Sequence, residues 1–150
     1  MARSLDTLVA PADQARVVDA IRRAEARTSG EVKVHVEARC PGGDPFARAR
    51  ALFAHLGLEK TRERNGVLIY VAVDDRRFAI LGDAGIHDAV GGQPFWEGAA
   101  TKMRAAFVRG ALADGLLAAI DEVGTQLAER FPHRADDVNE LSDDISTDDD

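Results

Sequence analysis

The stretch from residue 64 to residue 87, RNGVLIYVAVDDRRFAILGDAGIH, decides the fold that the sequence predicts. Residues 67–73 are apolar throughout, which is typical of a central strand covered on both faces of a sheet. The acidic turn at residues 74–76 then reverses the chain, so residues 77–82 are expected to return as the second strand of an antiparallel hairpin. A polar loop or short helix is expected to follow from Asp83.

Upstream, residues 31–38 alternate valines with polar side chains, the pattern of a strand that lies near a sheet edge and buries one face. His35 is therefore expected on the exposed face. A helix over about residues 45–56, capped by Asp44, connects this strand to residues 67–73, so the two strands should be parallel. Further helices are expected over residues 11–27, from about Pro94 onward, and over residues 114–130. Helices before, between and after the strands predict an α/β fold, a three-layer α/β/α sandwich around a small mixed sheet.

The length of 150 residues fits one domain, which we place at residues 11–133 after a flexible N-terminus of residues 1–10. The net charge of −7 is concentrated at the C-terminal end. Residues 136–150 contain eight acids and no Lys or Arg, so the rest of the chain carries about one positive charge. Residues 134–150 are expected to form an acidic disordered tail. Its three apolar residues could instead dock on a partner or on the domain itself: Val138, Leu141 and Ile145.

Composition also limits the partners and the location. The nearly neutral body offers no clustered basic face, so we expect no nucleic acid partner. The single Cys40 cannot form an internal disulfide. No signal peptide and no apolar run near the ~18 residues of a membrane span are found, so we expect a cytoplasmic protein without a membrane span. We expect a monomer, with an unknown protein partner that binds through the acidic tail.

The predicted strand directions bring several polar side chains to one end of the sheet. Glu31 begins the first strand, Asn65 precedes the parallel strand, and Asp83 ends the antiparallel one. His87 and Asp88 follow closely enough to fold over the same end. Carboxylate and amide oxygens are the ligands that Ca²⁺ and Mg²⁺ prefer, so the predicted site is a divalent-cation site with the following ligands: Glu31, Asn65, Asp83 and Asp88.

Two alternatives to this site remain open. Asp83 before Ala-Gly could simply cap a turn, and Glu31 could begin an exposed strand. Asp74 and Asp75, in the hairpin turn at the opposite end of the sheet, form a weaker candidate because acids are ordinary turn residues.

Four short motifs in a fixed order resemble the TPM domain family. They are TSGEV at residues 28–32, RNGVLI at 64–69, RFAILGDAGI at 77–86 and GLLAAI at 115–120. The similarity spans about residues 11–132, and the tail sequence NELSDDIS at residues 139–146 looks like that of short stand-alone bacterial members.

The resemblance implies the three-layer fold and a divalent-cation site, whereas it fixes no single activity. A plant relative of the thylakoid lumen, linked to photosystem II repair, is described as an acid phosphatase, and animal relatives are membrane accessory proteins. Many bacterial members carry a signal peptide, a membrane helix and a Gly-rich tail, all of which we expect this chain to lack. Glu31, Asn65, Asp83 and the loop through Asp88 match the family pattern.

Two functions follow as hypotheses. The first is a divalent-cation-binding module with an accessory or protein-interaction role. The alternative is a metal-assisted acid phosphatase acting on phosphomonoesters, in which the cation polarises a phosphoryl oxygen and a carboxylate acts as base. Binding is favoured because the sequence contains no recognisable nucleophile motif, and Arg64 is the only nearby candidate for an Arg clamp.

Overall fold

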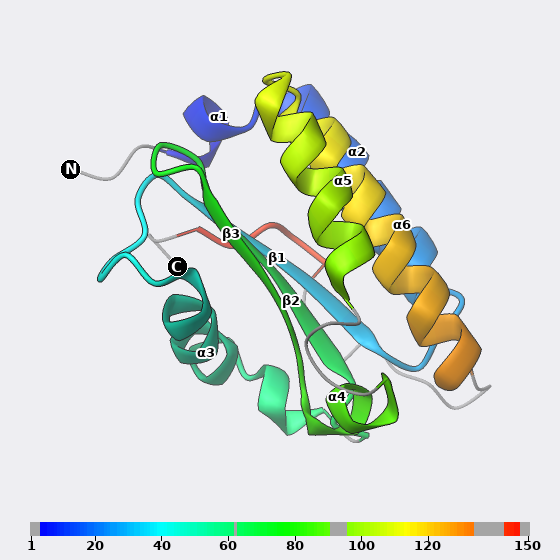
Figure 1. Cartoon of the computed structure of the whole chain (residues 1–150). Coiled ribbons are helices and arrows are strands. Elements are labelled where there is room, and N and C mark those ends of the chain that lie inside the picture. Colours follow the sequence, from blue (N-terminus) through cyan, green and yellow to red (C-terminus); the bar gives the residue numbers. More distant parts are fainter. Residues whose placement is uncertain (1–3, 62, 91–95, 134–142, 148–150) are drawn as a thin grey trace.

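The computed structural model describes residues 4–61, 63–90, 96–133 and 143–147, without the side chains of residues 88–90. Figure 1 shows a central sheet with α3 on one face and α2, α5 and α6 on the other. The three-layer α/β/α sandwich around a small mixed sheet is therefore confirmed. The elements follow the chain as α1 (Leu5–Leu8), α2 (Pro11–Glu25), β1 (Glu31–Glu37), α3 (Pro45–His55), η1 (Leu58–Lys60), β2 (Gly66–Ala72), β3 (Arg77–Gly82), α4 (Ala84–Val90), α5 (Glu97–Val108) and α6 (Leu112–Arg130).

The sheet has the order β1-β2-β3. β1 runs parallel to β2, with Glu31 opposite Gly66, and β2 runs antiparallel to β3, with Ala72 opposite Arg77. Both predicted strand directions are thus confirmed. The crossover from β1 to β2 passes through α3, which begins where the Asp44 carboxylate accepts hydrogen bonds from the backbone N–H groups of Phe46 and Ala47.

Two apolar clusters lie on the two faces of the sheet. On the face covered by α2, α5 and α6, the core includes Val34, Ile69 and Leu116. On the α3 face, Phe53 packs with Leu68 and other residues of β2. β2 is buried along its whole length because both of its faces are covered, which explains its unbroken apolar sequence.

The polar face of β1 is buried, so the exposed position expected for His35 is wrong. His35 is only 1% exposed, and its ring stacks on that of Tyr70 in β2 at a centroid distance of 5.9 Å. Arg48 of α3 reaches the same face, where it donates two hydrogen bonds to the Glu37 carboxylate. Side chains from α3 and β2 therefore cover a surface that the alternating pattern assigns to solvent.

The two ends of the chain also contribute to the core. Leu8 and Val9 are buried with the main cluster, so residues 5–9 differ from the flexible N-terminus that we expected. Residues 143–147 differ from a disordered tail, because they run beside β1 and bury Ile145 (Figure 1, red). Ile145 therefore docks on the domain itself, whereas Val138 and Leu141 lie outside the described residues.

Among the helices that the structure describes, α6 is the longest, with 19 residues. Within the described ranges, none combines the length and the apolar character that crossing a bilayer requires.

Candidate functional site

The polar residues predicted to meet at one end of the sheet have neighbouring backbones. Glu31 lies opposite Gly66 in the β1–β2 ladder, and the N–H of Asp83 donates to the carbonyl of Gly66 at 2.9 Å. Asn65 directly precedes β2. Their side chains, however, contact three different sets of partners.

Asn65 forms a partly buried polar site with Ser29 and Glu63, which we call the Asn65 site. The Asn65 amide donates to Ser29 Oγ at 3.2 Å and to Glu63 Oε2 at 3.1 Å, and the Ser29 hydroxyl donates to the same Glu63 oxygen at 2.5 Å. The Asn65 side chain is 1% exposed, and its Oδ1 has no hydrogen-bond partner among the described residues. Leaving a buried acceptor unsatisfied costs about 1–3 kcal/mol, so this oxygen is available to a ligand.

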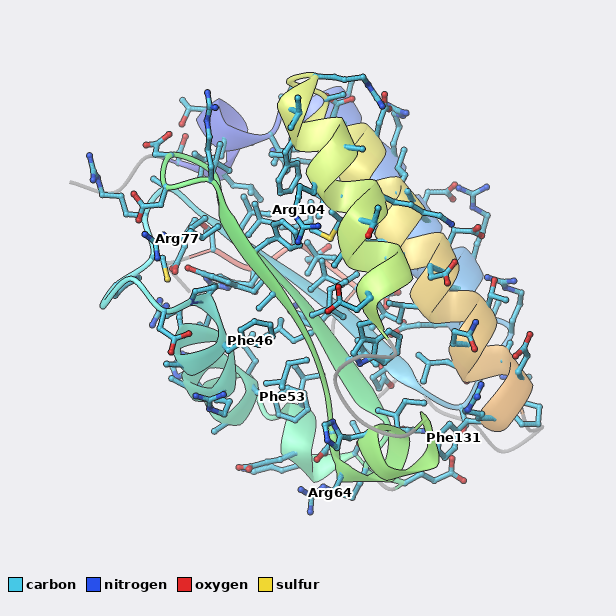
Figure 2. All side chains as sticks on the ribbon, in the orientation of Figure 1. Phe46, Phe53, Arg64, Arg77, Arg104 and Phe131 are labelled. Atoms are coloured by element: carbon cyan, nitrogen blue, oxygen red, sulfur yellow. The ribbon has the colours of Figure 1, made fainter. Side chains whose placement is uncertain are left out.

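The Asp83 carboxylate is held by Arg64 and by α4. Arg64 Nε lies 2.8 Å from Asp83 Oδ2, and Arg64 Nη2 lies 2.9 Å from Oδ1. Oδ1 also accepts from the N–H of Ala84, the first residue of α4, at 2.7 Å. Figure 2 shows Arg64 at this end of the sheet, beside α4. The charge on Asp83 is therefore neutralised by a guanidinium group.

Close packing of α4 on the loop before β2 keeps Asp83 and Arg64 together. The N–H of Gly85 donates to the carbonyl of Arg64 at 2.8 Å. A Cβ at Gly85 would lie 2.6 Å from Arg64 O and closer still to Glu63 O, so only glycine fits against these backbone atoms. The loop itself bends at Arg64, which has a φ of 54°.

Glu31 belongs to a carboxyl cluster with Glu25 and Asp143. Burial raises the pKa of Glu25 to about 11, and hydrogen bonds with Asp143 and Glu31 add to the rise. Glu25 Oε2 also accepts from the N–H of Val32 at 2.8 Å. Glu25 is therefore protonated at neutral pH. Glu25 and Asp143 were not predicted as neighbours of Glu31. They come from a helix and from a distant tail segment, and no spacing rule connects them to β1.

The remaining predicted residues lie apart from these groups or outside the description. Asp88 is in α4, but its side chain lies outside the described residues. His87 is half-buried in the same helix. At the opposite end of the sheet, Asp75 Oδ2 accepts from the N–H of Cys40 at 2.8 Å, and Arg39 lies 3.7 Å from its other oxygen. Asp75 thus has structural partners of its own.

A buried polar network on the α3 face was also not predicted from the sequence. Glu37 accepts a hydrogen bond of 2.5 Å from the Tyr70 hydroxyl and two from Arg48, while His35 Nε2 lies 3.2 Å from Glu37 Oε1. Burial alone would raise the pKa of Glu37, but hydrogen bonds with His35, Arg48 and Tyr70 outweigh burial and lower it to about 2. Glu37 therefore remains ionised in a position where both of its oxygens are satisfied.

The described residues contain no group of three or more His, Cys, Asp and Glu side chains that could hold a metal ion together. At the Asn65 site, the Glu63 carboxylate and the Ser29 hydroxyl contact the amide nitrogen of Asn65, so a cation bound by all three groups would require the amide to turn its Oδ1 toward them. Such a set fits a weakly held ion that keeps several of its waters, as Mg²⁺ often does.

The TPM domain family model matches residues 5–126 of the chain. Since this match covers most of the sequence, the chain belongs to the TPM domain family. Among solved structures, it is similar to the NMR structure of the BA42 protein from the psychrophilic bacterium Bizionia argentinensis, a small stand-alone protein. The two share 40% identity over 96% of this chain and 98% of BA42, with a TM-score of 0.86. No match was found among curated proteins.

Proposed function

We propose that this TPM domain is a divalent-cation-binding module with an accessory, protein-interaction role. The observation that carries the proposal is the Asn65 side-chain oxygen, which is buried and accepts no hydrogen bond from the described residues. The amide nitrogen of the same side chain donates to the Glu63 carboxylate, so a negatively charged group is near. Ca²⁺ and Mg²⁺ both prefer such oxygen ligands.

Asn65 and Glu63 are the residues that would hold the ion, with the Ser29 hydroxyl beside them. The ion would add a positive charge beside the Glu63 carboxylate and would fix the loop that leads into β2. Asp83 remains a predicted ligand, but a cation would compete there with Arg64. Glu31 and Asp88 also remain predictions, with Glu31 next to Glu25 in the carboxyl cluster.

Thermal unfolding with added metal tests this function. Ca²⁺ or Mg²⁺ at about ten times its dissociation constant should stabilise the folded state by ~1.4 kcal/mol, which corresponds to a rise in Tm of about 3–6 °C. Asn65→Ala should abolish this rise because it removes the proposed ligand oxygen. The measured quantity is the metal-induced change in Tm, so any effect of the substitution on the metal-free Tm does not enter.

Asp83→Ala and an exposed control, Asp121→Asn on α6, separate the possible sites. Asp121→Asn should keep the full rise. A wild-type melting curve that does not move at millimolar metal would refute cation binding. A rise that survives Asn65→Ala but disappears in Asp83→Ala would place the ion at the predicted Asp83 end instead.

We rank binding above the phosphatase alternative, which stays a prediction. Arg64, the residue considered for an Arg clamp on phosphate, is bound through two nitrogens to Asp83. A phosphoryl group would have to displace that carboxylate to use the guanidinium group.

A further inference from the structure

Residues 143–147 add a short strand-like segment to the outer edge of β1. The N–H of Ser146 donates to the carbonyl of Val34 at 3.0 Å, and the N–H of Val36 donates to the carbonyl of Ser146 at 2.9 Å. His35 and Ser146 thereby form a parallel bridge. The segment occupies the edge of β1 that faces away from β2, which is where a further strand would pair.

Each of the four residues from Asp143 to Ser146 makes its own contact with the domain, through its side chain or its backbone. Asp143 Oδ2 lies 3.6 Å from Arg22 Nε, and the Asp144 carbonyl accepts from Lys33 Nζ at 2.8 Å. Ile145 is 7% exposed and belongs to the main apolar core. Ser146 is 3% exposed, with Oγ 2.8 Å from His35 Nδ1. The edge of β1 is therefore complementary to an acidic residue, a carbonyl, an apolar side chain and a small hydroxyl side chain in that order.

The segment is distant in sequence from the strand on which it docks. Nine residues, 134–142, separate it from the part of the chain that follows α6. β1 also pairs with β2 along all seven of its residues without the segment. Exchange of the segment would thus leave the rest of the sheet intact, as in strand addition to an exposed sheet edge.

The four positions of the segment differ in burial. Ile145 and Ser146 are buried, whereas Asp143 is half-buried and Asp144 is exposed. The segment is therefore anchored by its apolar and hydroxyl side chains, and another extended segment with these two groups in the same order could take its place.

We propose that the outer edge of β1 is a strand-docking site for a partner protein with an extended segment of the type Asp-Asp-Ile-Ser, and that residues 143–147 occupy this site until such a partner replaces them. The expected partner segment has an acid, then a residue that contributes its backbone carbonyl to Lys33, then a β-branched apolar residue, then Ser or Thr. This inference rests on the protein-interaction role proposed above and names the chemistry of its partner. It does not depend on the Asn65 site.

A labelled peptide with the sequence of residues 141–147, LSDDIST, tests the site on the full-length chain. Ile145→Asp should release the chain's own segment, because a charge cannot replace a buried apolar side chain. The peptide should then bind this variant about tenfold more tightly than wild type, in which the tethered segment competes at high effective concentration. A peptide with Asp in place of its Ile should not bind either chain.

Hydrogen exchange locates the bound peptide. The Val36 N–H should lose protection in Ile145→Asp and regain it when the peptide is added, because this group pairs with the segment. If Ile145→Asp fails to fold, Ser146→Pro replaces it, since proline removes the N–H that donates to Val34. Equal peptide affinity for wild type and variant, or no peptide binding to a folded variant, would overturn the proposal.

Two further outcomes test which molecule occupies the strand-docking site and whether a cation takes part in binding. A wild-type chain that forms a dimer by exchanging its own segment would assign the site to a second copy and overturn the assignment to a partner. The titration is repeated in EDTA, where binding should be unchanged because the segment's contacts are hydrogen bonds, an ion pair and apolar packing. Peptide binding without any metal-induced rise in Tm would retain the strand site and refute the cation module.

Discussion

Glu25 and Glu37 are carboxyl groups in the interior of the same domain, yet their pKa values move in opposite directions. Glu37 receives hydrogen bonds from Arg48 and Tyr70, so it stays ionised. Glu25 has acidic neighbours, of which Glu31 is one, so it holds a proton. Burial is common to both, and the charge of the neighbours decides the protonation state.

The free energy of unfolding of Glu25→Gln is expected to exceed that of wild type by an amount that grows as the pH rises. Glu25 ionises at about its ordinary pKa of 4.5 in the unfolded chain, whereas the folded chain holds the proton up to a pKa of about 11. Between these values the folded state binds one more proton than the unfolded state, so stability falls with rising pH. Glutamine does not titrate and keeps an oxygen that can accept from the N–H of Val32.

Urea unfolding at about pH 5, 7 and 9 measures this effect, and the stability difference between Glu25→Gln and wild type should grow with pH. Glu129→Gln, at the exposed end of α6, is the matched control and should follow the wild-type profile. Parallel profiles for Glu25→Gln and wild type would show that Glu25 is ionised in the folded domain.

At the level of elements, β2 and β1 show what a pattern in the sequence can predict. β2 is apolar throughout and was correctly placed in the middle of the sheet, because burial on both faces determines that pattern directly. β1 alternates, and its polar face was assigned to solvent. The groups that cover it include Ser146, which lies 111 positions from His35, so no local pattern could have predicted their contact.

The same reason limits the prediction of the candidate site. Strand order and direction correctly placed Glu31, Asn65 and Asp83 at one end of the sheet. The partners of each side chain depend on the loop before β2 and on the tail segment, whose conformations carry no periodic signal. Glu63 could have been predicted as a partner of Asn65, because it lies two residues earlier and a side chain at that spacing in a turn can face the same group.

Gly85→Ala is expected to separate α4 from the loop before β2. Its Cβ would meet backbone atoms of Glu63 and Arg64, which cannot move as a flexible side chain could. The overpacking should destabilise the domain by about 1–3 kcal/mol in urea unfolding. Gly98→Ala in α5 is the control, because its Cβ would lie at an ordinary 3.5 Å from Glu122 Oε1. A Gly85→Ala variant as stable as Gly98→Ala would contradict the tight contact.

Across the whole molecule, one sheet connects two apolar clusters that lie on opposite faces. The larger cluster contains Trp96, the only tryptophan of the chain, and the smaller one contains Leu68 and residues of α3. Neighbouring residues of β2 contribute to different clusters, as Leu68 and Ile69 do. The two clusters are thus expected to unfold together.

Leu68→Ala tests this cooperativity, because it creates a cavity only on the α3 face. The substitution should cost about 2–5 kcal/mol. Trp96 fluorescence and far-UV circular dichroism should report the same lowered midpoint, although Trp96 lies on the other side of the sheet. Val108→Ala is the control, since Val108 is 83% exposed, and should leave both midpoints unchanged. Two separate midpoints would show that the α3 layer unfolds independently.

The segment at residues 143–147 also affects how the molecule behaves at high concentration. A sheet edge with free N–H and C=O groups is a template on which other chains can polymerise, and β1 presents a valine-rich edge of this kind. The segment shields that edge at Val34 and Val36, where its backbone hydrogen bonds are made. Residues at the far end of the chain therefore protect the first strand against aggregation, and loss of these residues would lower solubility even where folding is preserved.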